Sequence, residues 1–189
     1  MEATKYVSTH ESGFYLDFSY VDFPEKYLQE MSSRMQEALS SMKQLEGGAI
    51  ANPDENRMVG HYWLRNSGMA PTEEISEKIM QMQEQVRDIA ERVHSGTLSA
   101  PAGKFTDLLV IGIGGSALGP QFVGKALGDP NEDKLNVHFF DNTDPDGIDL
   151  TLAEIGSNLA TTLALVISKS GGTPETRNGM LEAESAFSE

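Results

Sequence analysis

The sequence predicts an α/β protein in which a three-layer, doubly wound parallel sheet follows a helical N-terminal region. Three short apolar runs are the expected strands: Leu108–Ile111, Val137–Phe140 and Leu163–Ile167. Each run precedes a segment with helical character, at residues 116–127, 145–155 and 174–187. Strands that alternate with helices form parallel sheets. Continuously apolar strands are typical of a sheet that helices cover on both faces.

Two amphipathic helices are expected before the sheet. Asp22 and Glu25 have the spacing of a capping box, and Pro24 suits a first helical turn, so the first helix should begin there and end at Gly47-Gly48. Its apolar positions recur at steps of three and four residues, which predicts a stripe that packs in a core. These positions are Leu28, Met31, Met35, Ala38, Met42 and Leu45.

The second expected helix spans about Thr72 to His94, with an apolar stripe of the same kind. Glycine and proline then interrupt the pattern between Gly96 and Gly103. This interruption predicts two domains, a mainly helical region over residues 1–100 and an α/β domain over residues 101–189.

Composition excludes several classes of protein. The 189 residues carry a formal net charge of −15, which repels nucleic acid and anionic membranes. The chain has no cysteine, so disulfides and thiolate metal sites are excluded. Met1–Lys5 lack the basic start of a signal peptide, and a cytoplasmic location is expected.

No metal site is expected either. His10, His61, His94 and His138 show no ligand spacing. Asn142–Gly147 imitates the start of a calcium loop, but Ala153 stands where a bidentate glutamate is required, so a turn and helix cap are expected there.

A glycine-rich loop, Gly112–Pro120, follows the first expected strand. Glycines let the backbone approach a ligand closely, and the N–H groups of the next helix favour an anion. Gly112, Gly114 and Ala117 also fit a dinucleotide fingerprint, with Asp141 placed as a ribose-binding acid. A Rossmann-type, NAD-dependent oxidoreductase is therefore an alternative. A P-loop is excluded because no Gly-Lys-Ser/Thr follows.

A second loop, Ser168–Thr176, follows the third expected strand. Three hydroxyls and one ammonium group converge there on a glycine turn: Ser168, Lys169, Ser170 and Thr173. Thr173 and Pro174 also suit a helix N-terminus, and this explains Thr173 without a ligand. It does not explain the two serines, whereas a phosphate group requires several donors.

The two loops resemble those of the phosphoglucose (glucose-6-phosphate) isomerase family, and the second also resembles the wider sugar-isomerase (SIS) domain. A third stretch, Glu55–Asn66, is similar to the family's Glu-Asn-Arg-x-Val-x-His-x-x-Leu-Arg-Asn motif. The resemblance implies an SIS-type domain over residues 101–189. It also implies an enzyme that interconverts glucose 6-phosphate and fructose 6-phosphate through a cis-enediol, without cofactor or metal.

The resemblance places the phosphate on Ser168, Lys169, Ser170 and Thr173, and it places Gly115 and Ser116 beside the substrate. The family often has threonine at the position of Ser170 and a bulkier residue at that of Gly171. Its catalytic glutamate and ring-opening histidine lie downstream of Glu189. We therefore expect an N-terminal segment with no catalytic residue of its own, inactive alone and dimeric in the full-length enzyme. A non-catalytic sugar-phosphate-binding module is a second alternative. The roles of His61 and Glu175 stay open.

Overall fold

The computed structural model describes residues 7–188, which form two compact units that divide between Met82 and Gln83. The expectation that Met1–Lys5 are not a signal peptide concerns residues outside this range. The first unit contains a hairpin, β1 (Val7–Thr9) and β2 (Tyr15–Asp17), and the helix α1 (Tyr27–Glu46). A second small hairpin and short helices follow: β3 (Ile50–Asn52), β4 (Arg57–Met58), α2 (His61–Arg65) and η2 (Ser67–Met69).

Helix α1 differs from its prediction in two respects. It begins at Tyr27 rather than at Pro24, and its N-terminus has no side-chain cap, so the capping box of Asp22 and Glu25 does not form. The predicted core stripe is also wrong, because no residue of α1 is buried within the described structure. Periodicity shows that a helix has an apolar face, but not what covers that face.

One buried side chain organises the end of this unit. Trp63, on α2, is 5% exposed, and its Nε1 donates a 2.8 Å hydrogen bond to the carbonyl oxygen of Glu46. This bond ties α2 to the last residue of α1. The helix α3 (Glu73–Ser95) then leads into the second unit, and His94 lies in its last turn as predicted.

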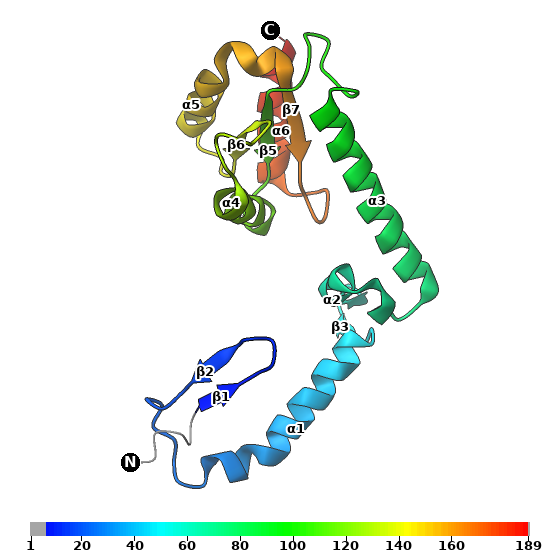
Figure 1. Cartoon of the computed structure of the whole chain (residues 1–189), viewed down its shortest axis with the longest axis vertical. Helices are drawn as coiled ribbons and strands as arrows, with labels where there is room; N and C mark the ends of the chain where they lie inside the picture. Colours follow the sequence, from blue (N-terminus) through cyan, green and yellow to red (C-terminus); the bar gives the residue numbers. More distant parts are fainter. Residues whose placement is uncertain (1–6, 189) are drawn as a thin grey trace. The chain divides into compact units, whose positions relative to one another are not determined.

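The second unit is built on a three-stranded parallel sheet with the order β6-β5-β7 (Figure 1). The strands are β5 (Asp107–Ile111), β6 (Asn136–Phe140) and β7 (Thr162–Val166). Residue 107 pairs with both 136 and 162, and the register continues without a shift to the other end of β5. All three predicted strands are confirmed to within one residue.

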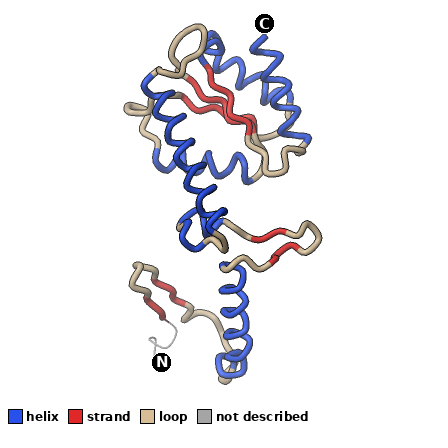
Figure 2. The backbone as a smooth tube through the Cα atoms, turned by 90° about the vertical axis from the view of Figure 1, so that its right-hand side faces the viewer, coloured by secondary structure: helices blue, strands red, loops and turns tan. Residues whose placement is uncertain are grey.

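Helices lie on both faces of this sheet (Figure 2). They are α4 (Gly115–Leu127), α5 (Pro145–Ile155) and α6 (Pro174–Ser188), with the short η3 (Gly156–Thr161) after α5. Leu109 and Ile111 of β5 pack in one buried cluster with Phe140, Ile148, Ile155 and Ala183, on the side of α5 and α6. Side chains alternate along a strand, so Leu108 and Val110 point to the opposite side, where α4 lies.

Close packing on the α6 side depends on one glycine. A Cβ atom at Gly179 would lie 3.0 Å from Cγ2 of Ile111, so a larger residue there would require Ile111 or α6 to shift by a few tenths of an ångström. The architecture is therefore a mixed helix–strand unit with a parallel sheet, in agreement with the predicted α/β class.

Candidate functional site

The two glycine-containing loops meet where the three strands end. The N–H of Gly112 donates to the carbonyl oxygen of Phe140 at 3.0 Å, and the N–H of Ile167 donates to that of Ile111 at 2.8 Å. A Cβ atom on Gly112 would lie 3.2 Å from the Ile167 carbonyl oxygen, and 2.9 Å from the Cβ atom of Ser116. The loop after β5 therefore passes directly beside the loop after β7. Ligands of open α/β sheets bind at this edge.

The first loop turns sharply into α4. Gly114 has φ 56° and ψ −125°, a conformation that side chains rarely permit. Its carbonyl oxygen accepts hydrogen bonds from the N–H groups of Ala117 and Leu118. The N–H groups of Gly114 and Gly115 donate to no acceptor within residues 7–188, and both residues are exposed. They are available to an anion at the positive end of α4.

The second loop folds around its own hydroxyl groups. The Oγ of Ser168 accepts a 3.0 Å hydrogen bond from the N–H of Gly171, and the Oγ of Ser170 accepts a 3.2 Å bond from that of Gly172. The Oγ1 of Thr173 lies 3.2 Å from the Oγ of Ser168. Gly171 has φ 72°, which allows the chain to reverse between these bonds.

These bonds leave part of the hydroxyl protons to an external acceptor, because one of Ser168 and Thr173 donates to the other, whereas Ser170 only accepts. A hydroxyl oxygen that accepts a bond from an N–H group keeps its own proton to donate elsewhere. Ser170 and Lys169 are exposed, and Lys169 takes part in none of the ion pairs of the described chain. The loop therefore presents hydroxyl donors and one cation on a short turn. This arrangement suits an oxyanion with several acceptor oxygens.

Helix α6 begins immediately after this loop, at Pro174, as predicted. Thr173 thus occupies the N-cap position, and its carbonyl oxygen accepts the N–H of Arg177 at 3.0 Å. Glu175 lies exposed in the first helical turn, where a carboxylate is favoured by the helix dipole.

Asp141, at the carboxyl end of β6, was considered above as a ribose-binding acid. In the structure one of its oxygens, Oδ2, accepts a 2.7 Å hydrogen bond from Nε2 of Gln121, on α4. The other, Oδ1, accepts a 2.8 Å bond from Nδ2 of Asn142. Asp141 is thus engaged by two protein amides. Sequence reasoning missed Gln121 because a glutamine within a helix carries no local signal.

The predicted turn forms at Asn142–Asp144, whereas Pro145–Gly147 belong to α5. The side-chain oxygen of Asn142 accepts the N–H of Asp144 at 2.8 Å, and α5 begins at Pro145. Asp144 occupies the N-cap position, but its side chain forms no capping hydrogen bond. Within residues 7–188, no three histidine, aspartate or glutamate side chains gather as a metal-binding group.

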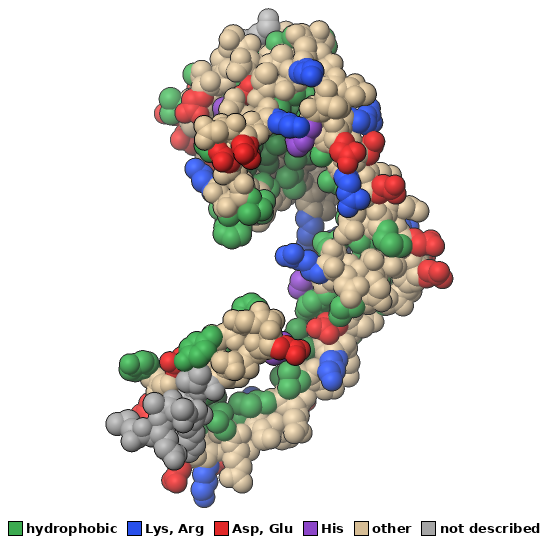
Figure 3. Space-filling model, in the orientation of Figure 1, with side chains coloured by type: hydrophobic (Ala, Val, Ile, Leu, Met, Phe, Trp, Pro, Cys, Tyr) green, Lys and Arg blue, Asp and Glu red, His purple; other side chains and the backbone are tan. Residues whose placement is uncertain are grey.

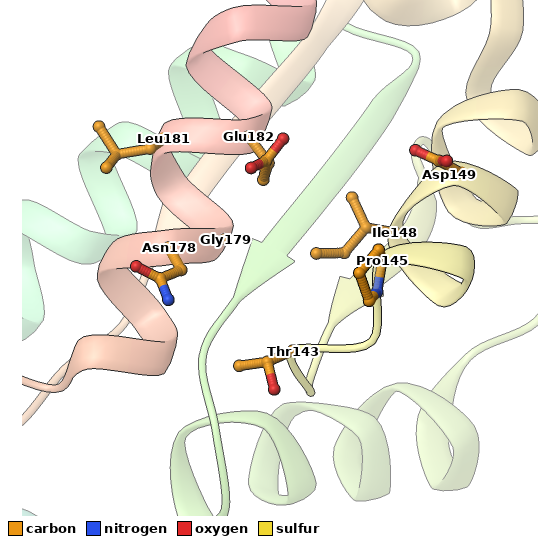
Figure 4. A pocket seen from close by; sticks show the side chains of 8 residues that line it. All are labelled: Thr143, Pro145, Ile148, Asp149, Asn178, Gly179, Leu181 and Glu182. Atoms are coloured by element: carbon orange, nitrogen blue, oxygen red, sulfur yellow. The ribbon is translucent and has the colours of Figure 1, made fainter.

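Two cavities lie away from these loops. One, of about 410 Å³, opens between α5 and α6 (Figure 4). Its polar lining comes from Thr143, Asp149, Asn178 and Glu182. The other, of about 740 Å³, separates the C-terminal half of α4 from the sheet, with Leu108 and Phe139 on one side and Val123 and Leu127 on the other. Neither includes a residue of the second loop, so neither replaces the strand-end loops as the candidate site.

The opposite ends of β5 and β6 carry a buried polar cluster. Asp107 is 2% exposed and accepts hydrogen bonds from Nε2 of His138 at 2.9 Å, Oγ1 of Thr106 at 2.7 Å and Nδ2 of Asn136 at 3.2 Å. Burial raises the pKa of Asp107, but these bonds outweigh it and hold the pKa below its usual value. His138 is thus a largely buried side chain that is hydrogen-bonded to Asp107. The cluster lies at the strand starts, away from the loops.

His61 belongs to the first unit. It is exposed at the start of α2, and its ring lies 3.9 Å from that of Tyr62, centre to centre. Arg57, in the same motif, forms a 3.0 Å ion pair with Glu55. None of the helices of residues 7–188 is both long and apolar enough to cross a lipid bilayer.

Comparison with known proteins identifies the family of the chain. The family model described as phosphoglucose isomerase matches residues 17–189. Glucose-6-phosphate isomerase of Geobacter sp. (strain M21) is 59% identical over 173 residues, which are 91% of this chain and 32% of that protein. Glucose-6-phosphate isomerase of Synechococcus elongatus is 57% identical over 177 residues, 93% of this chain and 33% of that protein. The chain thus spans about a third of the length of these relatives. It belongs to the phosphoglucose isomerase family.

Proposed function

We propose that this chain provides the phosphate-recognition part of an isomerase that interconverts glucose 6-phosphate and fructose 6-phosphate. The substrate's phosphate would bind the second loop, through Ser168, Lys169, Ser170 and Thr173. Its sugar would lie against Gly115 and Ser116 of the first loop. The observation that carries the proposal is the donor-rich turn of the second loop, which lies beside unpaired N–H groups at the same edge of the sheet.

The remaining parts of the proposal rest on family membership and on the loops together. Residues 101–189 would be an SIS-type, doubly wound domain, and residues 1–100 its helical lead-in. The proton transfer through a cis-enediol would require acid and base residues that this chain does not supply. The relatives are about three times as long, and their further residues would carry those groups. The full-length enzyme would be a cytoplasmic homodimer that needs no cofactor.

The NAD-dependent alternative is less well supported by the site. A ribose-binding acid must accept hydrogen bonds from the ribose hydroxyls. Asp141 accepts one bond on each oxygen, from Gln121 and from Asn142, so only part of its acceptor capacity is left for a ribose. A dinucleotide also leaves the hydroxyl groups of the second loop without a role. The non-catalytic sugar-phosphate-binding module remains the second candidate, because the same loops would serve it.

Ligand-dependent thermal stability distinguishes these functions. We expect 6-phosphogluconate, a stable phosphosugar acid, to raise the melting temperature of the 189-residue chain, and NADH to leave it unchanged. Stabilisation by NADH alone would overturn the proposal. The chain by itself should not turn over fructose 6-phosphate at an enzymatic rate, because it lacks the acid–base groups. Measured turnover would refute that part.

Matched variants locate the phosphate. Replacement of Lys169 and Ser170 together by alanine removes one cation and one hydroxyl, and should weaken 6-phosphogluconate binding at least about tenfold. Ser157→Ala is the control, since Ser157 is an exposed serine in η3 outside both loops. Equal affinities for the double variant and the control would place the phosphate elsewhere.

A further inference from the structure

The carboxylate of Asp141 joins two elements that border the site. Asp141 follows the last residue of β6, and its 2.7 Å bond with Gln121 reaches across to α4. Asn142 supplies the second amide donor and fixes the other carboxylate oxygen. The carboxylate is half-buried. A hydrogen bond between an amide and a carboxylate is stronger than one between neutral groups.

Helix α4 has few other means of holding its position. It contains Gly119, Gly124 and an internal Pro120, all of which weaken a helix. Ala117 is its one buried residue, whereas Leu118 and Phe122 are 63% and 73% exposed. Figure 3 shows apolar side chains at the surface in the region of α4. The cavity of about 740 Å³ beneath its C-terminal half further reduces contact with the sheet.

The N-terminus of α4 could pivot without such a tether. It begins at Gly115, directly after Gly114, and glycine backbones resist rotation least. Gln121 lies less than two helical turns from Gly115, so a bond at Gln121 limits the directions in which Gly114, Gly115 and Ser116 present their donors. Holding donors in place before the ligand arrives lowers the ordering cost of binding.

We infer that Asp141 is a positioning residue, which through Gln121 holds α4 and orients the first loop toward the sugar part of the ligand. The inference rests on the proposed function for the identity of that ligand. The structural half of the inference is that the bond between Asp141 and Gln121 immobilises residues 112–122, and this half does not depend on the proposed function. The two halves are therefore tested by separate measurements.

The bond between Gln121 and Asp141 can be tested by exchanging its donor and its acceptor. Gln121→Glu places two carboxylates at the 2.7 Å contact and should break it. Adding Asp141→Asn restores a bond of opposite direction, because the new amide donates to the new carboxylate. Gln85→Glu is the matched control, an identical substitution at an exposed position of α3. Gln121→Met, which removes the donor without adding charge, replaces Gln121→Glu if that variant does not fold.

Hydrogen exchange followed by mass spectrometry tests the structural half without ligand. Gln121→Glu should speed exchange of the peptide covering residues 112–122 about tenfold, and leave that of residues 167–176 unchanged. The double variant should return to the wild-type rate. Unchanged exchange in Gln121→Glu, acceleration of both peptides alike, or no recovery in the double variant would overturn the inference.

Affinity measurements test the role in binding. The loss of one charge-assisted bond should weaken 6-phosphogluconate binding about tenfold in Gln121→Glu, but leave inorganic phosphate within about twofold. A merely structural defect would weaken both ligands together. Equal loss for both, or none for either, would contradict the positioning role. If the wild-type chain binds neither ligand, the proposed function fails, and hydrogen exchange alone decides whether Asp141 immobilises the loop.

Discussion

Replacement of Asp107 by alanine should cost the second unit much of its stability. The carboxylate is 2% exposed and accepts three hydrogen bonds, from His138, Thr106 and Asn136. Asn136 and Thr106 are exposed, so water can replace the lost partner there. The side chain of His138 is only 15% exposed and would lose its partner in a nearly dry environment. We therefore expect a loss of about 2 kcal/mol, the cost typical of leaving one buried hydrogen-bonding group without a partner, rather than the sum over three bonds.

Urea denaturation at pH 7, followed by circular dichroism, measures this loss. Asp149→Ala is the control, because Asp149 is an exposed aspartate on α5, and its loss should change stability by less than about 0.5 kcal/mol. A loss below about 1 kcal/mol for Asp107→Ala would show that the cluster is hydrated in solution, and would refute the reasoning.

The contribution of Asp107 to the stability of the second unit depends on pH. The pKa of Asp107 is lowered in the folded chain, so its contribution is complete above the pKa of the unfolded chain and is lost as the pH falls through the folded pKa. The difference in stability between the wild type and Asp107→Asn should therefore be constant near neutrality and shrink below about pH 4. A difference that stays constant down to pH 3 would contradict the ionised state of Asp107.

Two further changes test local features. Gly114→Ala should destabilise the second unit by about 1–3 kcal/mol in chemical denaturation, because φ 56° and ψ −125° suit glycine. Gly119→Ala is the control, because a Cβ atom there meets open space, and it should stabilise the unit by up to about 1 kcal/mol. Trp63→Phe should destabilise the first unit by about 1–2 kcal/mol through loss of the bond to Glu46. Circular dichroism is the suitable measurement, since Trp63 is the single tryptophan of the chain; a loss near zero would show that water replaces the bond.

The candidate site could be predicted largely because its signals are local. Glycine, serine and threonine follow apolar strands at Gly112 and at Ser168, and the rule that ligands bind beyond the carboxyl ends of strands places both segments at one edge. The structure confirms that these segments are neighbours, through the contact of Gly112 with Ile167. The internal hydrogen bonds of the second loop could not be predicted, because hydroxyl orientation depends on the folded backbone.

The predictions that were wrong concern α1, because a local sequence pattern does not show what surrounds a helix in the folded chain. The apolar stripe of α1 was expected to be buried, yet no residue of that helix is. The spacing of Asp22 and Glu25 fits a capping box, but the helix begins one turn later.

The sequence by itself determined the order and nature of the elements of the second unit, the two loops at its strand ends, and membership of the family. These features depend on hydrophobic periodicity and on residue types within a few positions of one another. The tertiary structure alone decided which distant side chains meet, as in the pairs Asp107–His138 and Gln121–Asp141. Such pairs, 31 and 20 residues apart, depend on strand register and on the rotation of a helix over the sheet. Those quantities follow from the packing of the whole unit, which no short stretch of sequence encodes.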